Sequence, residues 1–195
     1  MAKRNGTSVI TNEVRLSYVS LVKPKESDNG GKPKYSVCAM IPKKDKETVN
    51  AIVAAYNQAY NESITKVWGG KKAEKKSPFR DGDTDPTKEG KSEFKGMYFF
   101  NASSVRKPQV IDKATGGLAA EDEIYSGMWA KLSLNLFGYD SKGAKGISFG
   151  INGAFKTRDD ENLSGGSNAF ADFADDLEDA GILGLDGEDD DALKF

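Results

Sequence analysis

The stretch M-W-A-K-L-S-L-N-L-F-G-Y, residues 128–139, decides the fold class. Side chains alternate between the two faces of a β-strand, so this stretch has one wholly apolar face and one mixed face. The apolar face consists of Met128, Ala130, Leu132, Leu134 and Leu136. The mixed face consists of Trp129, Lys131, Ser133, Asn135, Phe137 and Tyr139. We therefore expect a strand that covers a core on one side and presents aromatic and basic side chains on the other.

The segments around this strand predict a small β-barrel. Residues 8–22 and 34–41 contain β-branched and aromatic runs separated by a polar turn, which indicates a hairpin. Further strands are expected at 96–102, 109–112 and 146–155. The chain has 21 glycines and 6 prolines, and the glycines fall mostly between short apolar runs, as in turn-rich β proteins. The fold class is therefore mainly β, a barrel of five or so strands.

One amphipathic helix is expected within the β framework, at about residues 45–66. Asp45 can cap it, and apolar residues recur at steps of three and four. The predicted core-facing stripe consists of Val49, Ile52, Val53, Tyr56, Tyr60 and Ile64. Residues 69–95 contain too few apolar side chains for a core of their own, so they are interpreted as a long polar loop.

Charge divides the chain into two parts. The formal net charge is −2, but residues 1–158 contain 27 Lys/Arg and 17 Asp/Glu, whereas residues 159–195 contain one Lys and 13 Asp/Glu. This change predicts a folded domain over 1–158 and an acidic, mostly disordered interaction tail over 159–195. A basic body with an acidic tail suits a polyanion-binding domain whose tail competes for its surface. Charge alone fits a merely solubilising tail equally well.

The residue types that are missing exclude several function classes. The chain has no histidine and a single cysteine, Cys38, which excludes Ser-His-Asp and Cys-His catalysis, zinc fingers and an intramolecular disulfide. We expect no cofactor and no metal. The sequence predicts neither a signal peptide nor a membrane-spanning segment. It predicts a reducing cytoplasm as the compartment of the protein.

The aromatic and basic residues are arranged as single-strand recognition requires, with rings for unpaired bases beside cations for phosphates. Trp129, Phe137 and Tyr139 lie beside Lys131 on one strand face, and Lys142 and Lys145 follow in the next loop. The polar loop repeats the pattern with Trp68, Lys71, Lys72, Lys75, Lys76, Phe79 and Arg80. The other candidate DNA-binding residues are Lys32, Lys34, Tyr35, Tyr98, Arg106 and Lys107. The alternative is that the rings form a second core beneath the helix and the polar loop.

The C-terminus combines an acidic run with an apolar tip. Asp189, Asp190 and Asp191 precede Leu193 and the terminal Phe195. Such a tip can insert its ring into a pocket of a partner while basic residues there bind the carboxylates. We therefore assign these residues to partner binding.

Two other function classes remain open. Asp81 and Asp83 could bind a metal in a nuclease or recombination enzyme, although an EF-hand loop starting at Asp81 would need Gly at Pro86 and Glu at Ser92. A structural or DNA-mimicking protein would instead use the acidic tail and ignore oligonucleotides. Metal-dependent cleavage would indicate the nuclease or recombination enzyme. Removing residues 159–195 separates the classes further, because the structural or DNA-mimicking protein acts through that tail.

Several runs together resemble the bacteriophage single-stranded DNA-binding proteins that have an OB-fold body. They are G-K-P-K-Y-S-V (31–37), R-D-G-D (80–83), G-M-Y-F-F-N-A-S-S (96–104), K-P-Q-V-I-D (107–112), Y-S-G (125–127) and K-G-I-S-F-G-I-N (145–152). Each run is weak alone, but their order and their coverage of roughly residues 10–155 make the resemblance fairly specific.

The resemblance implies a five-stranded barrel with extra loops and a helix. It also implies sequence-nonspecific binding of single strands in phage replication, recombination or repair, in the cytoplasm of the infected bacterium. The acidic tail with its terminal Phe is similar in composition to single-strand-binder tails, which recruit phage or host replication and recombination proteins and compete for the groove. RNA binding and homo-oligomer formation remain open.

Overall fold

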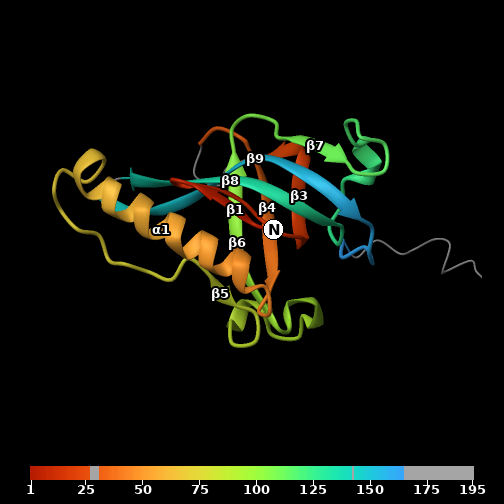
Figure 1. Ribbon diagram of the computed structural model, residues 1–195, viewed down its shortest axis with the longest axis horizontal. Helices are drawn as coiled ribbons and strands as arrows, with labels where there is room; N and C mark the ends of the chain where they lie inside the picture. Colours follow the sequence, from red (N-terminus) through yellow and green to blue (C-terminus); the bar gives the residue numbers. More distant parts are fainter. Residues whose placement is uncertain (27–30, 142, 165–195) are drawn as a thin grey trace, which may run out of the picture. The chain divides into compact units, whose positions relative to one another are not determined.

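The computed structural model describes residues 1–26, 31–141 and 143–164 of the 195-residue chain (Figure 1). The strands are β1 Lys3–Asn5, β2 Ser8–Ile10, β3 Val14–Lys25, β4 Lys34–Pro42, β5 Arg80–Asp81, β6 Met97–Ser104, β7 Gln109–Asp112, β8 Trp129–Ser141 and β9 Ala144–Arg158. One α-helix, α1, spans Lys46–Lys66, and short 3-10 turns lie at Pro86–Lys88, Ser92–Phe94 and Glu121–Glu123. The helix begins within one residue of the position expected from the sequence.

Five strands close into a barrel of the OB type. β3 pairs with β4, β4 with β6, β6 with β9, β9 with β8, and β8 again with β3. All of these pairings are antiparallel except β6–β9, which is parallel. Three additions extend the sheet: the β1–β2 hairpin pairs with β8, β7 pairs with β9, and the short β5 pairs with β6. The expected small barrel and the hairpin between β3 and β4 are therefore confirmed.

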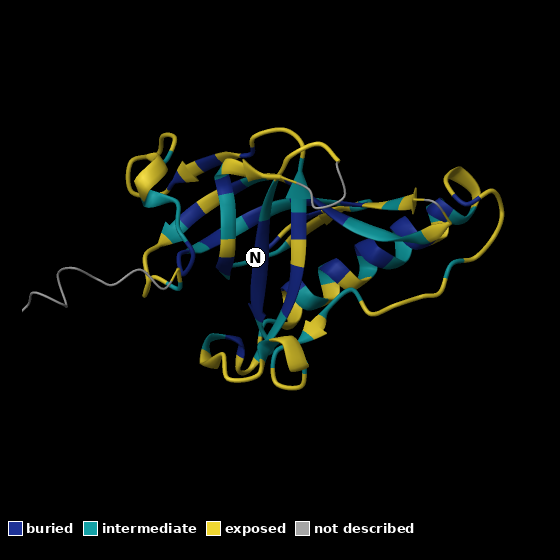
Figure 2. Ribbon diagram, turned by 180° about the vertical axis from the view of Figure 1, so that it is seen from behind, coloured by how far each residue is buried: buried dark blue, intermediate teal, exposed yellow. Residues whose placement is uncertain are grey.

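The apolar face of β8 forms the centre of the core. Met128, Ala130, Leu132 and Leu134 are 0% exposed and Leu136 is 2% exposed, as the alternation predicts. The other barrel strands contribute Leu16, Val37, Ile41, Phe100 and Phe149 to the same cluster. Figure 2 shows the buried residues concentrated in the barrel strands and on one face of the helix.

Helix α1 packs against β1, β2, β8 and β9. Its N-terminus is capped by Asp45, whose carboxylate accepts a hydrogen bond from the backbone N–H of Thr48 at 3.1 Å. The buried face consists of Thr48, Ile52, Ala55, Tyr56, Ala59, Tyr60 and Ser63. The prediction that Val53 faces the core is wrong: it is 37% exposed, because it is turned about 100° around the helix from the buried Ile52. A side chain at Gly138 would lie 2.1 Å from Ser63 Oγ, so the helix rests directly on β8.

A second, smaller cluster covers the outer side of β4 and β6. It consists of Cys38, Met40, Phe94 and Phe99. Cys38 is 2% exposed, and burial raises the pKa of its thiol to about 11. None of the helices in the described part of the chain is long and apolar enough to span a membrane.

Candidate nucleic-acid interface

A groove of about 680 Å³ crosses the outer wall of the barrel over β6, β8 and β9. We call it the sheet groove. It is lined by Lys34, Asn101, Ser103, Ser104, Val105, Asn135, Phe137, Tyr139, Ser141, Ile147, Ser148, Phe149, Gly150, Ile151 and Asn152. Seven of these fifteen residues are serine or asparagine, so the groove presents hydrogen-bonding groups beside its aromatic residues on β8. An extended, polar chain fits this surface better than a compact apolar ligand does.

Phe137 and Tyr139 supply the exposed rings of the sheet groove. They are 46% and 41% exposed, and both belong to the mixed face of β8. The paired residues on β9 are Ser148 and Gly146, neither of which has a bulky side chain. A side chain on Gly146 would lie 2.7 Å from the Tyr139 hydroxyl, so the Tyr139 side chain occupies the space that the glycine leaves. The rings are thus available for stacking without any change in the core.

A second hollow of about 240 Å³ adjoins the sheet groove and shares Asn101, Tyr139, Ile147 and Phe149 with it. The rest of its lining includes Tyr56 from α1 and, from the polar loop, Glu74, Lys76, Ser77, Pro78 and Arg80. Three candidate cations, Lys76, Arg80 and Lys145, contribute to this hollow. The fold therefore brings the polar loop beside Tyr139 of β8.

The cations of this region are fixed to different degrees. Arg80 forms a two-pronged ion pair with Asp85, at 2.6 Å and 2.8 Å, and its guanidinium lies 4.9 Å from the centre of the Phe99 ring. Lys145 lies 3.7 Å from a carboxylate oxygen of Asp140, whereas Lys34 is exposed at the opposite end of the sheet groove. The Arg80 side chain is therefore pre-positioned, whereas Lys34 is free to adjust its position to a phosphate.

Trp68 corrects one expectation from the sequence. Its side chain is 2% exposed, it contacts Tyr60 edge-on at 5.2 Å, and its indole N–H donates to the backbone carbonyl of Tyr139 at 3.0 Å. A ring in this position cannot stack on a base without leaving the core. Trp68 instead fixes the backbone that carries Tyr139, so it is a positioning residue.

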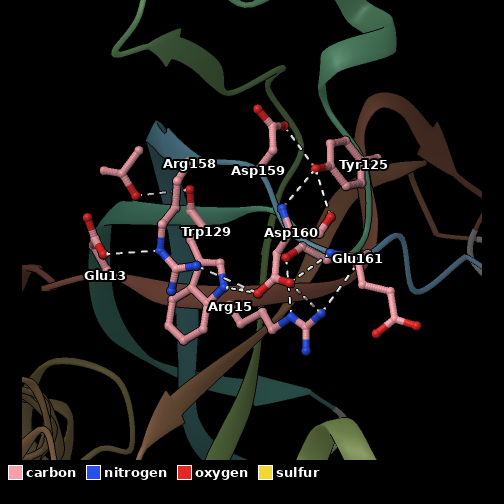
Figure 3. A network of polar contacts seen from close by, with 10 residues as sticks. Glu13, Arg15, Tyr125, Trp129, Arg158, Asp159, Asp160 and Glu161 are labelled. Carbon is pink, nitrogen blue, oxygen red and sulfur yellow. Dashed lines mark hydrogen bonds and ion pairs between the residues drawn. The ribbon is translucent and has the colours of Figure 1, made fainter. Parts of the chain in front are cut away.

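Trp129 lies on the mixed face of β8 but far from the sheet groove, at the opposite end of the strand. Its indole N–H donates to Asp160 at 2.7 Å, and the Arg158 guanidinium lies 4.1 Å from its ring centre (Figure 3). Asp160 also lies 3.6 Å from Arg15 and 3.7 Å from Arg158. Hydrogen bonding by Trp129 is the main reason that the pKa of Asp160 is held below its ordinary value.

The segment after β9 continues along the barrel instead of leaving it at residue 158. We call residues 159–164 the strap. Tyr125 contacts Asp159 at 2.8 Å, and Arg15 donates to the carbonyl of Glu161 at 3.3 Å (Figure 3). The N–H of Leu163 donates to the backbone carbonyl of Ser126 at 2.7 Å. Charge alone predicts that the strap belongs to the acidic tail. Its contacts place it with the barrel, because its carboxylates meet arginines and a lysine that the barrel presents.

The other candidate residues lie outside the sheet groove and its adjoining hollow. Phe79 and Tyr98 stack on each other at 5.7 Å, Lys107 pairs with Glu121 at 2.8 Å, and Lys131 lies on β8 toward Trp129. Tyr35 is half-buried, and exposed positions are occupied by Lys32, Lys71, Lys72, Lys75 and Arg106. Lys142 and the tail residues Asp189, Asp190, Asp191, Leu193 and Phe195 lie outside the described residues. For these side chains a role in binding stays a prediction.

Sequence reasoning missed the polar floor of the groove. Asn101, Ser103 and Asn135 line it from β6 and β8, among the aromatic and basic residues that the sequence pattern assigns to binding. The available signal was their position on the outward side of strands whose alternate residues are apolar. Such serines and asparagines are indistinguishable in sequence from ordinary solvated positions.

Asp81 and Asp83 have protein partners. Both carboxylates contact the ammonium group of Lys43, at 2.5 Å and 2.6 Å, and this contact lowers the pKa of each. Asp83 also accepts a hydrogen bond from the N–H of Gly96. Within the described residues, no group of three or more His, Cys, Asp or Glu side chains is placed to hold a metal ion. The two carboxylates therefore anchor the polar loop to the corner between β4 and α1.

Comparison with known proteins identifies similar chains. The family described as Enterobacter phage Enc34, ssDNA-binding protein, matches residues 7–183. Protein p50 of Acyrthosiphon pisum secondary endosymbiont phage 1 is 32% identical over 177 residues, which is 85% of this chain and 91% of that protein.

Solved structures show the same fold. The single-stranded DNA-binding protein of bacteriophage Enc34, in complex with ssDNA, is 26% identical with a TM-score of 0.69, over 84% of this chain and 97% of that one. The single-stranded DNA-binding protein gp2.5 of bacteriophage T7 is 16% identical with a TM-score of 0.56, over 100% of both chains, and supports the fold alone.

Proposed function

The chain belongs to the phage single-stranded DNA-binding protein family represented by Enterobacter phage Enc34, and from that premise we propose that it binds single-stranded DNA along the sheet groove. The observation that carries the proposal is the groove itself, in which Phe137 and Tyr139 are exposed between Lys34 and the hollow that contains Lys76, Arg80 and Lys145. Unpaired bases stack on the rings, and the cations neutralise phosphates.

This arrangement favours single strands over duplex. A base can meet the face of Phe137 or Tyr139 only when it is not stacked within a double helix, and each such contact contributes roughly 1–3 kcal/mol. The polar floor offers hydrogen bonds to any base, and a ring stacks on every base, so the affinity depends little on sequence. The protein therefore acts by coating and protecting single strands in phage replication, recombination or repair, inside the infected bacterial cell.

The experiment is a titration of labelled oligo-dT by fluorescence anisotropy at several salt concentrations, with a duplex of equal length as the control. We expect tight binding of the single strand and much weaker binding of the duplex. Four phosphate contacts, from Lys34, Lys76, Arg80 and Lys145, correspond to a slope of log affinity against log salt of roughly −3. Equal affinities for the two forms would contradict the proposal.

The acidic segment beyond the strap has a second role in this proposal. Its carboxylates compete with phosphates for the basic groove, and its end, from Asp189 to Phe195, binds replication or recombination proteins of the phage or its host. The charge contrast along the sequence supports this role.

The chemistry of the groove is recognition rather than bond-making. The carboxylates considered for a nuclease, Asp81 and Asp83, both bind Lys43, which supports a structural role for them. We expect a labelled single strand to stay intact on incubation with the protein and Mg²⁺. Metal-dependent cleavage that is lost in Asp83→Ala would instead support the nuclease.

A further inference from the structure

One row of paired residues extends the floor of the sheet groove across the whole barrel wall. Ser20 of β3 pairs with Ser36 of β4, and Ser36 pairs with Ser103 of β6. Ser103 pairs with Gly150 of β9, and Gly150 pairs with Asn135 of β8. Every member of the row is small or polar. A side chain at Gly150 would lie 2.5 Å from Asn135 Oδ1, so the glycine leaves the floor open for that amide.

The row connects two hollows. Ser103, Gly150 and Asn135 line the sheet groove, whereas Ser20 lines a separate hollow of about 300 Å³ at the other end of the row. Ser36, half-buried, lies between them and pairs with both neighbours. Paired strands lie about 4.8 Å apart, so the four steps from β8 to β3 cover roughly 19 Å of surface. That length accommodates several nucleotides of an extended strand.

Tyr18 projects into the hollow at the β3 end. It is 42% exposed, and its φ of 49° makes it the sole non-glycine residue with a positive φ in the described part of the chain. It lies where the register between β3 and β4 shifts, between Ser17 and Ser20. Such an irregularity redirects a side chain that regular alternation would point to the other face. Unusual backbone of this kind is found preferentially at functional sites.

The surroundings of Tyr18 are mostly basic. The ammonium group of Lys88 lies 4.4 Å from the centre of its ring, and Lys91 contacts its hydroxyl group. The contact with Lys91 is the main reason that the pKa of Tyr18 is lowered. Lys25 and Lys91 line the hollow together with one acidic residue, Glu93. The site thus combines a partly exposed ring with cations within reach of a phosphate, as at the Phe137 end.

We propose that Tyr18 is a second stacking position for the same DNA strand, which crosses the row from Phe137 and Tyr139 to Tyr18 and places phosphates near Lys88 and Lys91. This inference rests on the proposed function. It adds a site that neither the aromatic run of β8 nor the polar loop contains. It also predicts that binding gains a contact only when the oligonucleotide is long enough to reach β3.

The test compares Tyr18→Ala with Phe137→Ala in the full chain, on oligo-dT of increasing length within the range of about 4–16 nucleotides found for OB folds. Tyr18→Ala is expected to leave affinity for the shortest bound oligonucleotide unchanged and to weaken the longest at least about fivefold. Phe137→Ala is expected to weaken binding at every length. Phe155→Ala is the matched control, because Phe155 is 37% exposed and pairs with Ile111 and Lys131, away from the row.

Two further variants separate stacking from a structural role of Tyr18 in holding Lys88 and the loop around it. Tyr18→Phe keeps the ring and loses the hydroxyl contact, so it should retain most of the affinity for long oligonucleotides. Tyr18→Trp should add fluorescence that oligo-dT quenches, relative to the unchanged chain. Loss of affinity in Tyr18→Phe equal to that in Tyr18→Ala, or no added quenching, would overturn the stacking role.

The outcomes also separate this inference from the proposed function. If the unchanged chain binds single strands and Phe137→Ala weakens binding while Tyr18→Ala has no effect at any length, the second position fails and the groove stands. If the unchanged chain does not prefer single strands, the proposed function itself fails. Stronger binding by Tyr18→Ala would overturn the stacking role and would instead indicate that the acidic segment beyond residue 164 competes with DNA for this hollow. Ser164, the last described residue, lines it.

Discussion

The indole N–H of Trp129 donates a hydrogen bond to the carboxylate of Asp160 at 2.7 Å, joining the first residue of β8 to the strap. Arg158 covers the ring at 4.1 Å, and Arg15 and Arg158 both approach the same carboxylate. Trp129, one of the rings that the sequence pattern assigns to stacking, thus has partners within the chain.

Replacing Asp160 with Ala should therefore change the environment of Trp129. We expect a shift of its fluorescence emission and a lower midpoint of thermal unfolding, because the indole N–H and two arginines lose their acceptor. The control is Glu89→Ala, at an exposed acidic position in the polar loop. Identical emission spectra for the two variants would contradict this account of the strap.

The same contact predicts a pH dependence. Because the folded state lowers the pKa of Asp160, its contribution to stability is present above the ordinary carboxyl pKa of about 3.9 and is lost as pH falls through the lower folded value. Trp129 emission should therefore stay constant from neutral pH to about pH 4 and change only in stronger acid. Asp160→Asn should remove this acid transition.

Gly127 allows the strap to lie close to β8. Its φ is 119°, and a side chain there would lie 2.0 Å from the carbonyl oxygen of Glu161. Gly127→Ala should displace the strap and expose it to limited proteolysis, with a clear loss of stability. Gly116→Ala is the matched control, since Gly116 has a φ of 69° but open space around it. Equal proteolysis of both variants would show that backbone strain alone is responsible.

Trp68→Ala should destabilise the fold by about 3–5 kcal/mol, the usual cost of removing a large buried ring. Trp68→Phe should cost less, because it keeps most of the ring and loses mainly the hydrogen bond to Tyr139. Denaturant unfolding measures both. A loss below about 1 kcal/mol in Trp68→Ala would mean that the ring is not part of the core.

Phe137→Ala should weaken binding of oligo-dT by roughly 1–3 kcal/mol with little effect on stability, because the ring is 46% exposed. Anisotropy titrations and thermal unfolding give the two quantities. A large drop in unfolding temperature would assign the ring to packing instead.

Ending the chain at Ser164 removes ten acidic residues and one lysine but none of the contacts described above. We expect stronger binding of single strands at low salt, because an internal competitor for the cations is gone, and a smaller difference at high salt. The control ends at the same residue and carries Phe137→Ala. Unchanged affinity across the salt series would contradict competition by the tail.

The alternation of β8 predicted the core correctly but could not locate the site. Trp129 and Phe137 share a face, yet eight residues at about 3.3 Å each place them roughly 26 Å apart. Trp129 pairs with Arg15 of β3, whereas Phe137 pairs with Ser148 of β9. Sharing a strand face therefore does not mean sharing a groove, because the neighbours differ along the strand.

Trp68 shows a second limit. It follows a helix and precedes a lysine-rich loop, a context that suggests exposure. Its burial depends on the loop returning along the helix, where the Tyr60 hydroxyl donates to the carbonyl of Ala73 at 2.5 Å. The row from Ser20 to Asn135 likewise emerges only from pairings between distant strands. The residue pattern of one segment predicts its secondary structure, whereas the pairing of distant strands determines which side chains meet in a site.

The thiol of Cys38, sealed beneath Phe94 and Phe99 and unionised at neutral pH, also has a practical consequence. It is the sole native sulfhydryl, and maleimide dyes react with accessible thiolate. A cysteine introduced at an exposed site can therefore be labelled selectively without first removing the native one. The wild-type background is thus suited to fluorescence studies that need one dye at a chosen position.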